Sequence, residues 1–195
     1  MNALLVIANP SKTSFTHAMA TAASDILRSK GYTITCHDLY AEEFDPVQNT
    51  TEAENATSGN SLIEQHCAEL KSADLILIFH PNWWSQPPAI LKGWVDRVFR
   101  LGTAYEYPAN AGFDGVPNGI LTARHALIFN TSNTPTQREL EVFGDPLENL
   151  WRKSIFGLCG VSSVQRRMFG PMAASSIQQR ESWLQEVCSI VRNAA

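Results

Sequence analysis

Uninterrupted apolar runs along the chain predict a set of buried strands. Residues 3–8, 75–79 and 125–129 are almost wholly apolar and rich in bulky or β-branched side chains. Such runs are typical of parallel strands that are covered on both faces. Residues 32–39 alternate between apolar and polar positions, which predicts a strand at the edge of the sheet. A fifth strand is predicted over residues 158–164.

Apolar residues at spacings of three and four predict helices between these strands. The segments are 15–30, 62–72, 88–99, 145–156 and 175–193. Pro87 and Pro88 suit the first turn of the third segment, where a missing N–H is harmless. Polar stretches at 45–61 and 105–119 predict long loops, which in compact domains are either functional or mobile. Five strands alternating with five helices predict one doubly wound α/β domain over residues 1–195.

The loop that follows the strand at 75–79 carries unusual side chains. It contains Pro81, Asn82, Trp83, Trp84 and Ser85, and adjacent tryptophans cannot both face one core stripe of a helix. Ligands of open α/β sheets bind at the carboxyl ends of the strands, which favours a binding loop. Spacing alone leaves a second interpretation open, in which both tryptophans pack on a tight turn.

The loop after the first strand is a candidate phosphate site. Ser11 and Ser14 offer hydroxyl groups, Lys12 a positive charge, and the helix that follows offers free N–H groups at its start. Serine and threonine are also common as plain helix caps. The residues alone leave both interpretations open.

Charge and cysteine content exclude several classes of protein. The chain has 15 basic and 19 acidic residues, for a net charge of −4, which argues against nucleic acid or an anionic membrane as the main partner. The 4 cysteines form no Cys-x-x-Cys pair, and no spacing typical of metal ligands is present. No apolar run reaches the roughly 20 residues of a membrane span, and no signal-peptide pattern precedes the first strand. We therefore expect a cytoplasmic protein without membrane insertion or a bound metal.

Residues 88–99, Pro-Ala-Ile-Leu-Lys-Gly-Trp-Val-Asp-Arg-Val-Phe, followed by Ala104-Tyr105, resemble a segment of the NAD(P)H:quinone oxidoreductase family. These proteins are flavoproteins of flavodoxin-like fold. The resemblance implies strand order 2-1-3-4-5 with helices on both faces. It also implies a homodimer, with residues 40–60 and the helix that carries Trp94 as candidate contacts.

The resemblance extends to the first loop, which reads His-x-x-x-x-Ser-Phe-Asn in the family. Ser14 and Phe15 match, whereas Asn9 and Thr16 replace the histidine and the asparagine. Both replacements can hydrogen-bond, so a phosphate or diphosphate site is still implied. The residues implied there are Asn9, Ser11, Ser14, Phe15 and Thr16.

The loop after the fourth strand is Thr-Thr-Gly-Gly in the family and approaches the pyrimidine edge of the flavin. Here it reads Thr131, Ser132, Asn133, Thr134. Threonine disfavours positive φ, so this loop should run differently from a glycine pair. The implied flavin ring lies between this loop and Asn82-Trp83-Trp84-Ser85, with backbone N–H groups bonded to its polar edges. Tyr105 and Tyr107 are implied near the substrate side, although surface packing remains open for Tyr107.

The resemblance implies a flavin-dependent NAD(P)H oxidoreductase that reduces a quinone or similar small acceptor by a two-electron ping-pong cycle. Family members place a tyrosine and a histidine after the fourth strand to assist charge relay. Aligned on Gly144-Asp145, these positions are Gln137 and Phe143, which are poor proton donors. We therefore assign no catalytic residue and keep azo and nitro compounds as possible acceptors. FMN and FAD both remain open, and the short chain, which lacks the long C-terminal extension of larger members, favours FMN.

Two alternative functions fit the same fold. One is a flavodoxin-type electron carrier, for which a charge of −4 is modest. The other is a flavin-binding regulatory subunit of a membrane transporter, as in the potassium-efflux branch of the family. Oxidation of NADPH by the isolated protein separates the enzyme from the carrier, and co-purification with a membrane partner favours the subunit.

Overall fold

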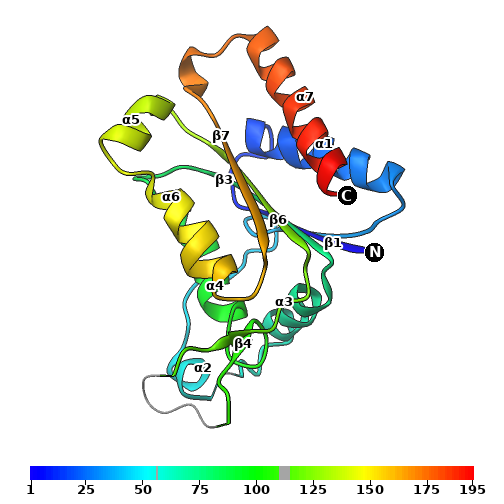
Figure 1. The fold of residues 1–195 in the computed structure, drawn as a ribbon, viewed down its shortest axis with the longest axis vertical. Coiled ribbons are helices and arrows are strands. Elements are labelled where there is room, and N and C mark those ends of the chain that lie inside the picture. The colour runs from blue at the N-terminus through cyan, green and yellow to red at the C-terminus, as the bar shows by residue number, and fades with distance from the viewer. Residues whose placement is uncertain (56, 110–114) are drawn as a thin grey trace.

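A computed structural model describes residues 1–55, 57–109 and 115–195 and shows a five-stranded parallel sheet (Figure 1). Its strands lie in the order β2-β1-β3-β6-β7, which is 2-1-3-4-5 in chain order. All four strand pairings are parallel. The strands are β1 (Asn2–Ile7), β2 (Thr33–Asp38), β3 (Leu75–Pro81), β6 (His125–Thr131) and β7 (Ser163–Phe169). The predicted fold class and strand order are confirmed.

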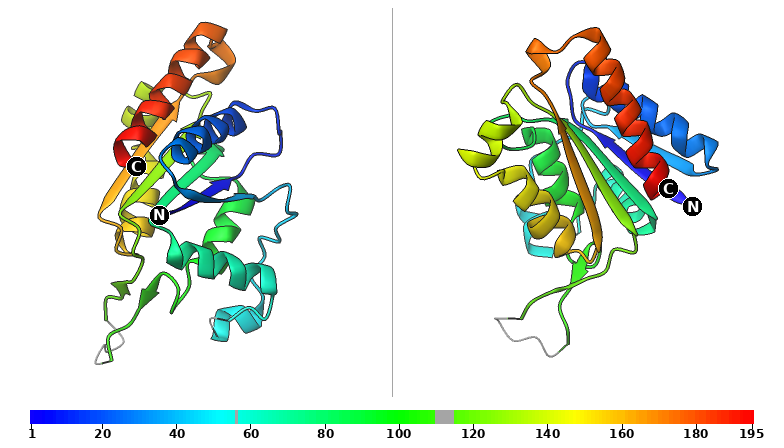
Figure 2. Two further views of the ribbon diagram at one scale, coloured as in Figure 1. Left: turned by 90° about the vertical axis from the view of Figure 1, so that its right-hand side faces the viewer. Right: turned by 45° about the horizontal axis from the view of Figure 1, so that its top comes forward.

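Helices cover both faces of the sheet (Figure 2). On one face lie α1 (Phe15–Ser29) and α7 (Ile177–Ala194). On the other lie α3 (Ser61–Ser72), α4 (Ala89–Val98) and α6 (Pro146–Glu148), which continues into the π-helix η1 (Asn149–Gly157). Within residues 1–55, 57–109 and 115–195, no helix has both the length and the apolar character needed to cross a membrane.

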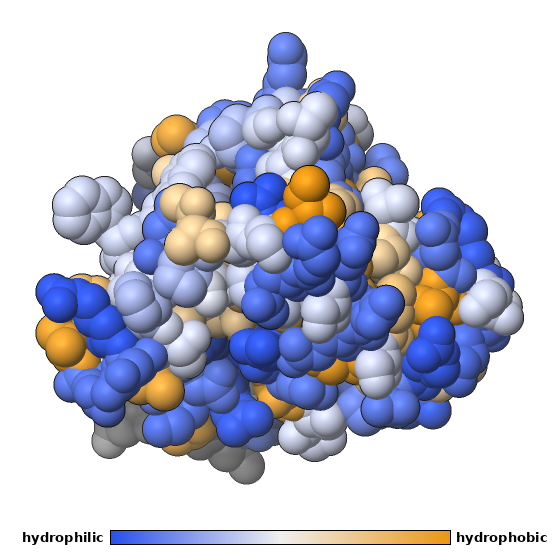
Figure 3. All heavy atoms as spheres, turned by 90° about the horizontal axis from the view of Figure 1, so that it is seen from above, coloured by the Kyte–Doolittle hydropathy of each residue, from blue (hydrophilic) through white to orange (hydrophobic). Residues whose placement is uncertain are grey.

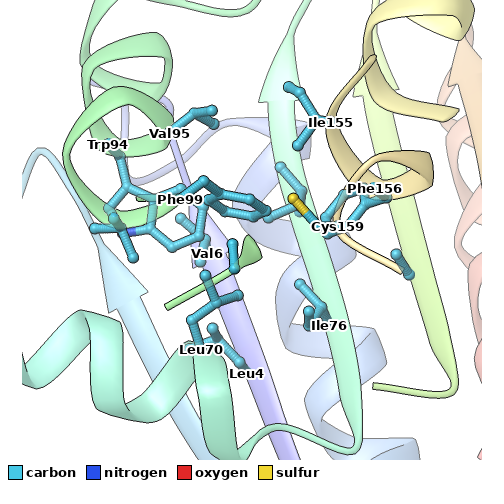
Figure 4. Packing of buried hydrophobic residues seen from close by; sticks show 14 of the residues in the cluster. Leu4, Val6, Leu70, Ile76, Trp94, Val95, Phe99, Ile155, Phe156 and Cys159 are labelled. Carbon is cyan, nitrogen blue, oxygen red and sulfur yellow. The ribbon is translucent and has the colours of Figure 1, made fainter. Parts of the chain in front are cut away.

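Alternation along each strand divides the core between the two faces. Leu4 and Val6 of β1 pack with Trp94, Phe99 and Phe156 on the face of α3 and α4 (Figure 4). The intervening residues of β1 belong to the second cluster, with the buried side chains of α1 and α7. Because both faces are covered, the middle positions of the central strands are apolar, which explains their uninterrupted runs.

The last strand, predicted at 158–164, lies five residues later, at Ser163–Phe169. Residues 158–160 continue as turns after η1, and Gly160 has a φ of 90°, a left-handed conformation that favours glycine. The strand itself, β7, pairs only with β6 and carries Arg166 and Arg167. A half-exposed edge strand with two arginines lacks the apolar run that marked the central strands.

The predicted loop at 45–61 contains a short helix, α2 (Thr50–Asn55). Asn49 and Glu52 cap its start reciprocally: Asn49 Oδ1 accepts from Glu52 N at 2.9 Å, and Glu52 Oε2 accepts from Asn49 N at 3.4 Å. Arg97 of α4 then holds Glu52 through two hydrogen bonds in the protein interior. Residue 56 of the predicted loop lies outside the described residues.

Four other segments differ from the sequence prediction. The 105–119 loop contains an antiparallel pair, β4 (Tyr105–Glu106) with β5 (Asn118–Gly119), and its residues 110–114 lie outside the described part of the chain. A helix that the pattern did not assign, α5 (Thr136–Glu141), follows β6, and a 3-10 turn, η2 (Met172–Ala174), precedes α7. The single helix predicted at 145–156 is divided between α6 and the wider turns of η1.

Candidate cofactor site at the carboxyl ends of the strands

Strands β3 and β6 end side by side, where Pro81 pairs with Thr131. The loops that follow them line a cavity of about 690 Å³. All of the residues predicted in these two loops line it: Pro81, Asn82, Trp83, Trp84, Ser85, Thr131, Ser132, Asn133 and Thr134. Phe143, Pro146 and Met172, which the sequence did not assign to a cofactor, complete the lining. The strand register therefore brings the two predicted loops together.

The loop after β3 is a tight two-residue turn with left-handed backbone. Trp83 and Gln86 exchange N–H to carbonyl hydrogen bonds, each of 3.0 Å. Between them, Trp84 and Ser85 have φ values of 56° and 57°, a conformation that costs an L-residue roughly 1–2 kcal/mol. The Trp84 side chain is 98% exposed, so packing within the chain does not explain it. Strain of this kind is typical of functional sites.

Few backbone N–H groups of these loops remain free for a ligand. Those of Asn82 and Ser132 donate to the carbonyl oxygens of Thr131 and Phe169, at 2.6 and 2.9 Å. The N–H of Thr134 donates to Ser132 Oγ at 3.0 Å, and Thr134 keeps a negative φ, so this loop closes without a glycine pair. In these two loops, the N–H groups of Trp84, Ser85 and Asn133 have no acceptor among the described residues.

A buried histidine fixes the backbone at the end of β3. Trp151 Nε1–H donates to His80 Nε2 at 3.1 Å. Because indole can only donate, His80 carries its proton on Nδ1 and donates it to the Pro81 carbonyl oxygen at 2.8 Å. Burial lowers the pKa of His80 to about 4. His80 is therefore a neutral positioning group beneath the cavity.

Behind the same turn lies a buried carboxylate that the sequence did not reveal. Glu139 of α5 is 1% exposed, and its Oε1 accepts from Asn82 Nδ2 at 3.1 Å and from Ser85 Oγ at 2.8 Å. Asn82 Oδ1 is itself buried without a donor among the described residues. A polar ligand with an N–H group would satisfy this oxygen, so the lining fits a heteroaromatic cofactor better than an apolar molecule.

The first loop lies at the same edge of the sheet but does not line this cavity. The side chain of Asn9 bridges the two ends of this loop: its Nδ2 donates to Thr16 Oγ1 and its Oδ1 accepts from Ser11 N, both at 3.0 Å. Ser14 caps α1. Among the described residues, no acceptor is found for the backbone N–H groups of Lys12, Thr13, Phe15 and Thr16 in this loop. Such groups at the start of a helix suit an anion.

The ring of Phe15 has a structural position. It packs edge-on against Phe169 and Trp183, with ring centroids 6.3 and 5.9 Å away. Phe15 is half-buried, and its ring contributes to the packing between α1, β7 and α7.

Tyr105 and Tyr107 do not reach the cavity of their own chain. They line a separate hollow of about 440 Å³ beside Arg100 and stack edge to face, with centroids 6.1 Å apart. Strand β4, which carries Tyr105, lies at the opposite end of the molecule from α5 (Figure 1). The expected place of both tyrosines on the substrate side therefore stays a prediction, which a single chain does not test.

A second cluster of polar groups has the spacing of a metal site. His37, Glu42 and His66 place ligand-type atoms within 4.8 Å of one another. Trp94 Nε1–H donates to His66 Nδ1 at 2.9 Å, so the neutral His66 ring carries its proton on Nε2. Metal ligation would require the opposite tautomer. The rings of His37 and His66 also stack, with centroids 3.7 Å apart and planes 24° from parallel. Burial, together with the nearby His37, lowers the pKa of His66 to about 4.

The surface around the candidate site is largely hydrophilic. Viewed from the end toward which the strands run, hydrophobic atoms form separate spots on this face (Figure 3). Trp84 and Phe143 of the cavity lining are 98% and 43% exposed. Trp83, next to Trp84 in the same lining, is 44% exposed. Exposed aromatic side chains around a cavity are typical of a small-molecule site.

A five-stranded parallel sheet of this order, with aromatic and hydroxyl side chains around a cavity at its carboxyl end, defines a flavodoxin-like protein. A family model described as "Flavodoxin-like fold" matches residues 1–190. The chain is 30% identical over 190 residues to an uncharacterized NAD(P)H oxidoreductase of Haemophilus influenzae, covering 95% of this chain and 91% of the relative. It is also 30% identical over 214 residues to a rat ribosyldihydronicotinamide dehydrogenase [quinone], covering 96% and 90%.

Solved structures share the whole fold. A crystal structure of a Streptococcus mutans UA159 protein superposes with a TM-score of 0.86 at 33% identity, covering 99% of this chain and 100% of that one. An FMN-dependent NADH-azoreductase of Bacillus anthracis, solved with FMN, gives 0.78 at 18% identity over 100% of both chains. The chain belongs to the flavodoxin-like fold family and, within it, to the NAD(P)H:quinone oxidoreductases.

Proposed function

We propose that this protein is a flavin-dependent NAD(P)H oxidoreductase that reduces a quinone or a similar small acceptor by a two-electron ping-pong cycle. The observation that carries the proposal is the cavity between the β3 and β6 loops, with its free N–H groups and the unpartnered Asn82 Oδ1. The relatives of known name support the reductant and the acceptor class. No catalytic residue is assigned in this chain, which is consistent with chemistry that resides in the cofactor.

FMN is the proposed cofactor. The free N–H groups of the first loop and the start of α1 suit its phosphate, with Ser11 and Ser14 as hydroxyl donors. The FMN complex of a protein with the same fold supports the choice. The rest of the cofactor would lie across the sheet edge toward the cavity at Pro81 and Thr131.

When bound, the flavin supplies hydride transfer, and the protein supplies position and electrostatics. The free N–H groups of Trp84, Ser85 and Asn133 would donate to the polar edge of the ring and stabilise charge there. Trp83 and Trp84 offer aromatic surface for the ring or for a planar acceptor. His80 stays neutral and holds the Pro81 carbonyl in place.

We further propose that the protein works as a homodimer in which Tyr105 and Tyr107 face the cavity of the second copy. The family resemblance places both tyrosines on the substrate side, whereas one chain holds them near the other end of the molecule. Light scattering should therefore give a mass near 43 kDa, which is twice the chain mass of 21.6 kDa. Tyr107→Ala should raise KM for the acceptor while FMN binding stays unchanged. A monomer with full activity would contradict this arrangement.

Steady-state oxidation of NADH and NADPH with a soluble quinone tests the activity. Double-reciprocal plots of initial rate against nucleotide concentration should give parallel lines at several acceptor concentrations, as expected for a ping-pong cycle. A protein that binds flavin but oxidises neither nucleotide would instead support the electron carrier, and activity that depends on an added membrane partner would support the transporter subunit.

A further inference from the structure

Glu139 is buried in a helix whose other residues are exposed. Helix α5 reads Thr-Gln-Arg-Glu-Leu-Glu, and only Glu139 in it is covered. Among the described residues, no lysine, arginine or histidine forms an ion pair with this carboxylate. A buried carboxylate without a cation is costly, so its retention calls for a physical reason.

The contacts of Glu139 lead directly to the cavity. Its Oε1 accepts from Ser85 Oγ at 2.8 Å and from Asn82 Nδ2 at 3.1 Å. The same amide nitrogen lies 3.4 Å from Ser132 Oγ, a contact at the outer limit of hydrogen bonding. One carboxylate oxygen thus holds the β3 loop at two points, and Asn82 carries the connection across to the β6 loop.

Ser85 is one of the two left-handed residues of the turn. A hydrogen bond to a carboxylate is stronger than one to a neutral acceptor, so Glu139 is suited to hold this strained residue in place. Glu139 Oε2 is also buried and has no partner in the described part of the chain. The Glu139 carboxylate therefore costs stability, and its place directly behind the cavity lining indicates a functional role.

We propose that Glu139 is a positioning residue for the cofactor cavity. It fixes Asn82 and the Trp84-Ser85 turn from behind, so that the free N–H groups of the turn keep one orientation toward a ligand. The identity of that ligand as FMN rests on the proposed function, whereas the positioning of the turn does not.

The test compares Glu139→Leu and Glu139→Gln with a matched control, Glu141→Gln. Glu141 lies on the same helix and is exposed, and among the described residues its carboxylate hydrogen-bonds only to Gln137. Amide hydrogen exchange of the cofactor-free proteins is measured over residues 82–86, where Trp83 and Gln86 hold each other's N–H. We expect exchange there to rise on the order of tenfold in Glu139→Leu and less in Glu139→Gln, and to stay unchanged in Glu141→Gln.

FMN titration of the same variants should give the same order. Affinity should fall by about tenfold or more in Glu139→Leu, with partial rescue by glutamine, and should stay within about twofold of wild type in Glu141→Gln. If wild type takes up no FMN while the exchange pattern holds, the proposed function fails and the positioning role stands. Unchanged exchange at 82–86 in folded variants overturns the inference. If Glu139→Leu does not fold, Ser85→Ala and Glu139→Gln decide, and each must raise exchange in this turn.

Discussion

Replacing Trp84 with glycine should stabilise the cofactor-free protein and weaken flavin binding. Trp84 has a φ of 56° and is 98% exposed, so the change removes left-handed strain and almost no buried surface. The strain is roughly 1–2 kcal/mol, and the greater freedom of glycine in the unfolded chain returns about 0.5–1 kcal/mol of it. The net gain of about 0.5–1 kcal/mol should raise Tm by roughly 1–4 °C in a chain of this size.

The same substitution removes the ring that a bound flavin or acceptor would cover. An aromatic contact contributes about 0.5–1.5 kcal/mol beyond its area, so FMN affinity should fall by roughly 3- to 10-fold. Thermal unfolding and FMN titration measure the two effects separately.

Glu43→Gly is the matched control for this experiment. Glu43 is also exposed and left-handed, with a φ of 51°, but it lies outside the cavity lining. It should stabilise the protein by a similar amount and leave FMN affinity unchanged. If Trp84→Gly lowers Tm while Glu43→Gly raises it, the strain account of the turn is refuted.

Two further predictions concern stability. Arg97→Met should lower the free energy of unfolding by about 3–5 kcal/mol in urea, because it leaves the buried Glu52 carboxylate without its cation, whose Nε lies 3.0 Å from Glu52 Oε2; a loss below about 1 kcal/mol would contradict the buried pair. Stability should also fall as the pH drops from about 6.5 to about 4, because His66 and His80 keep folded-state pKa values near 4 while the unfolded chain takes up their protons. Each histidine can account for a loss of up to about 3 kcal/mol in the free energy of unfolding over this range. Replacing both with glutamine should flatten the pH profile of stability, and an unchanged slope would refute their role.

Much of the fold could be predicted from the sequence, because burial of the sheet on both faces leaves a continuous apolar run in each central strand. The central strands β1, β3 and β6 each contain an apolar run that is covered on both faces, and these runs predict the strands directly. The edge strand β7 was misplaced because Arg166 and Arg167 interrupt its pattern. Helix α2 was missed although Asn49 and Glu52 form a recognisable capping pair, since the segment has few apolar anchors and is held by Arg97.

The candidate site was readable only where it follows strand ends. Register aligns Pro81 with Thr131, so the residues of both loops meet at one cavity, as proposed from their order in the chain. Glu139 could not be found in this way, because a glutamate in a short polar helix has the pattern of a solvated charge and only tertiary packing buries it. Tyr105 and Tyr107 lie in the connection from α4 to β6, at the amino ends of the strands, so they line a separate hollow of their own chain.

We propose that the cavity between the β3 and β6 loops holds a flavin that NAD(P)H reduces. The most direct measurement is the visible absorption spectrum of the purified protein after reconstitution with excess FMN or FAD and removal of free flavin, followed by chromatography of the cofactor released on denaturation. We expect an oxidised-flavin spectrum that bleaches when NADPH or NADH is added without air. The cofactor released on denaturation should be FMN. A colourless protein that retains neither flavin would contradict it.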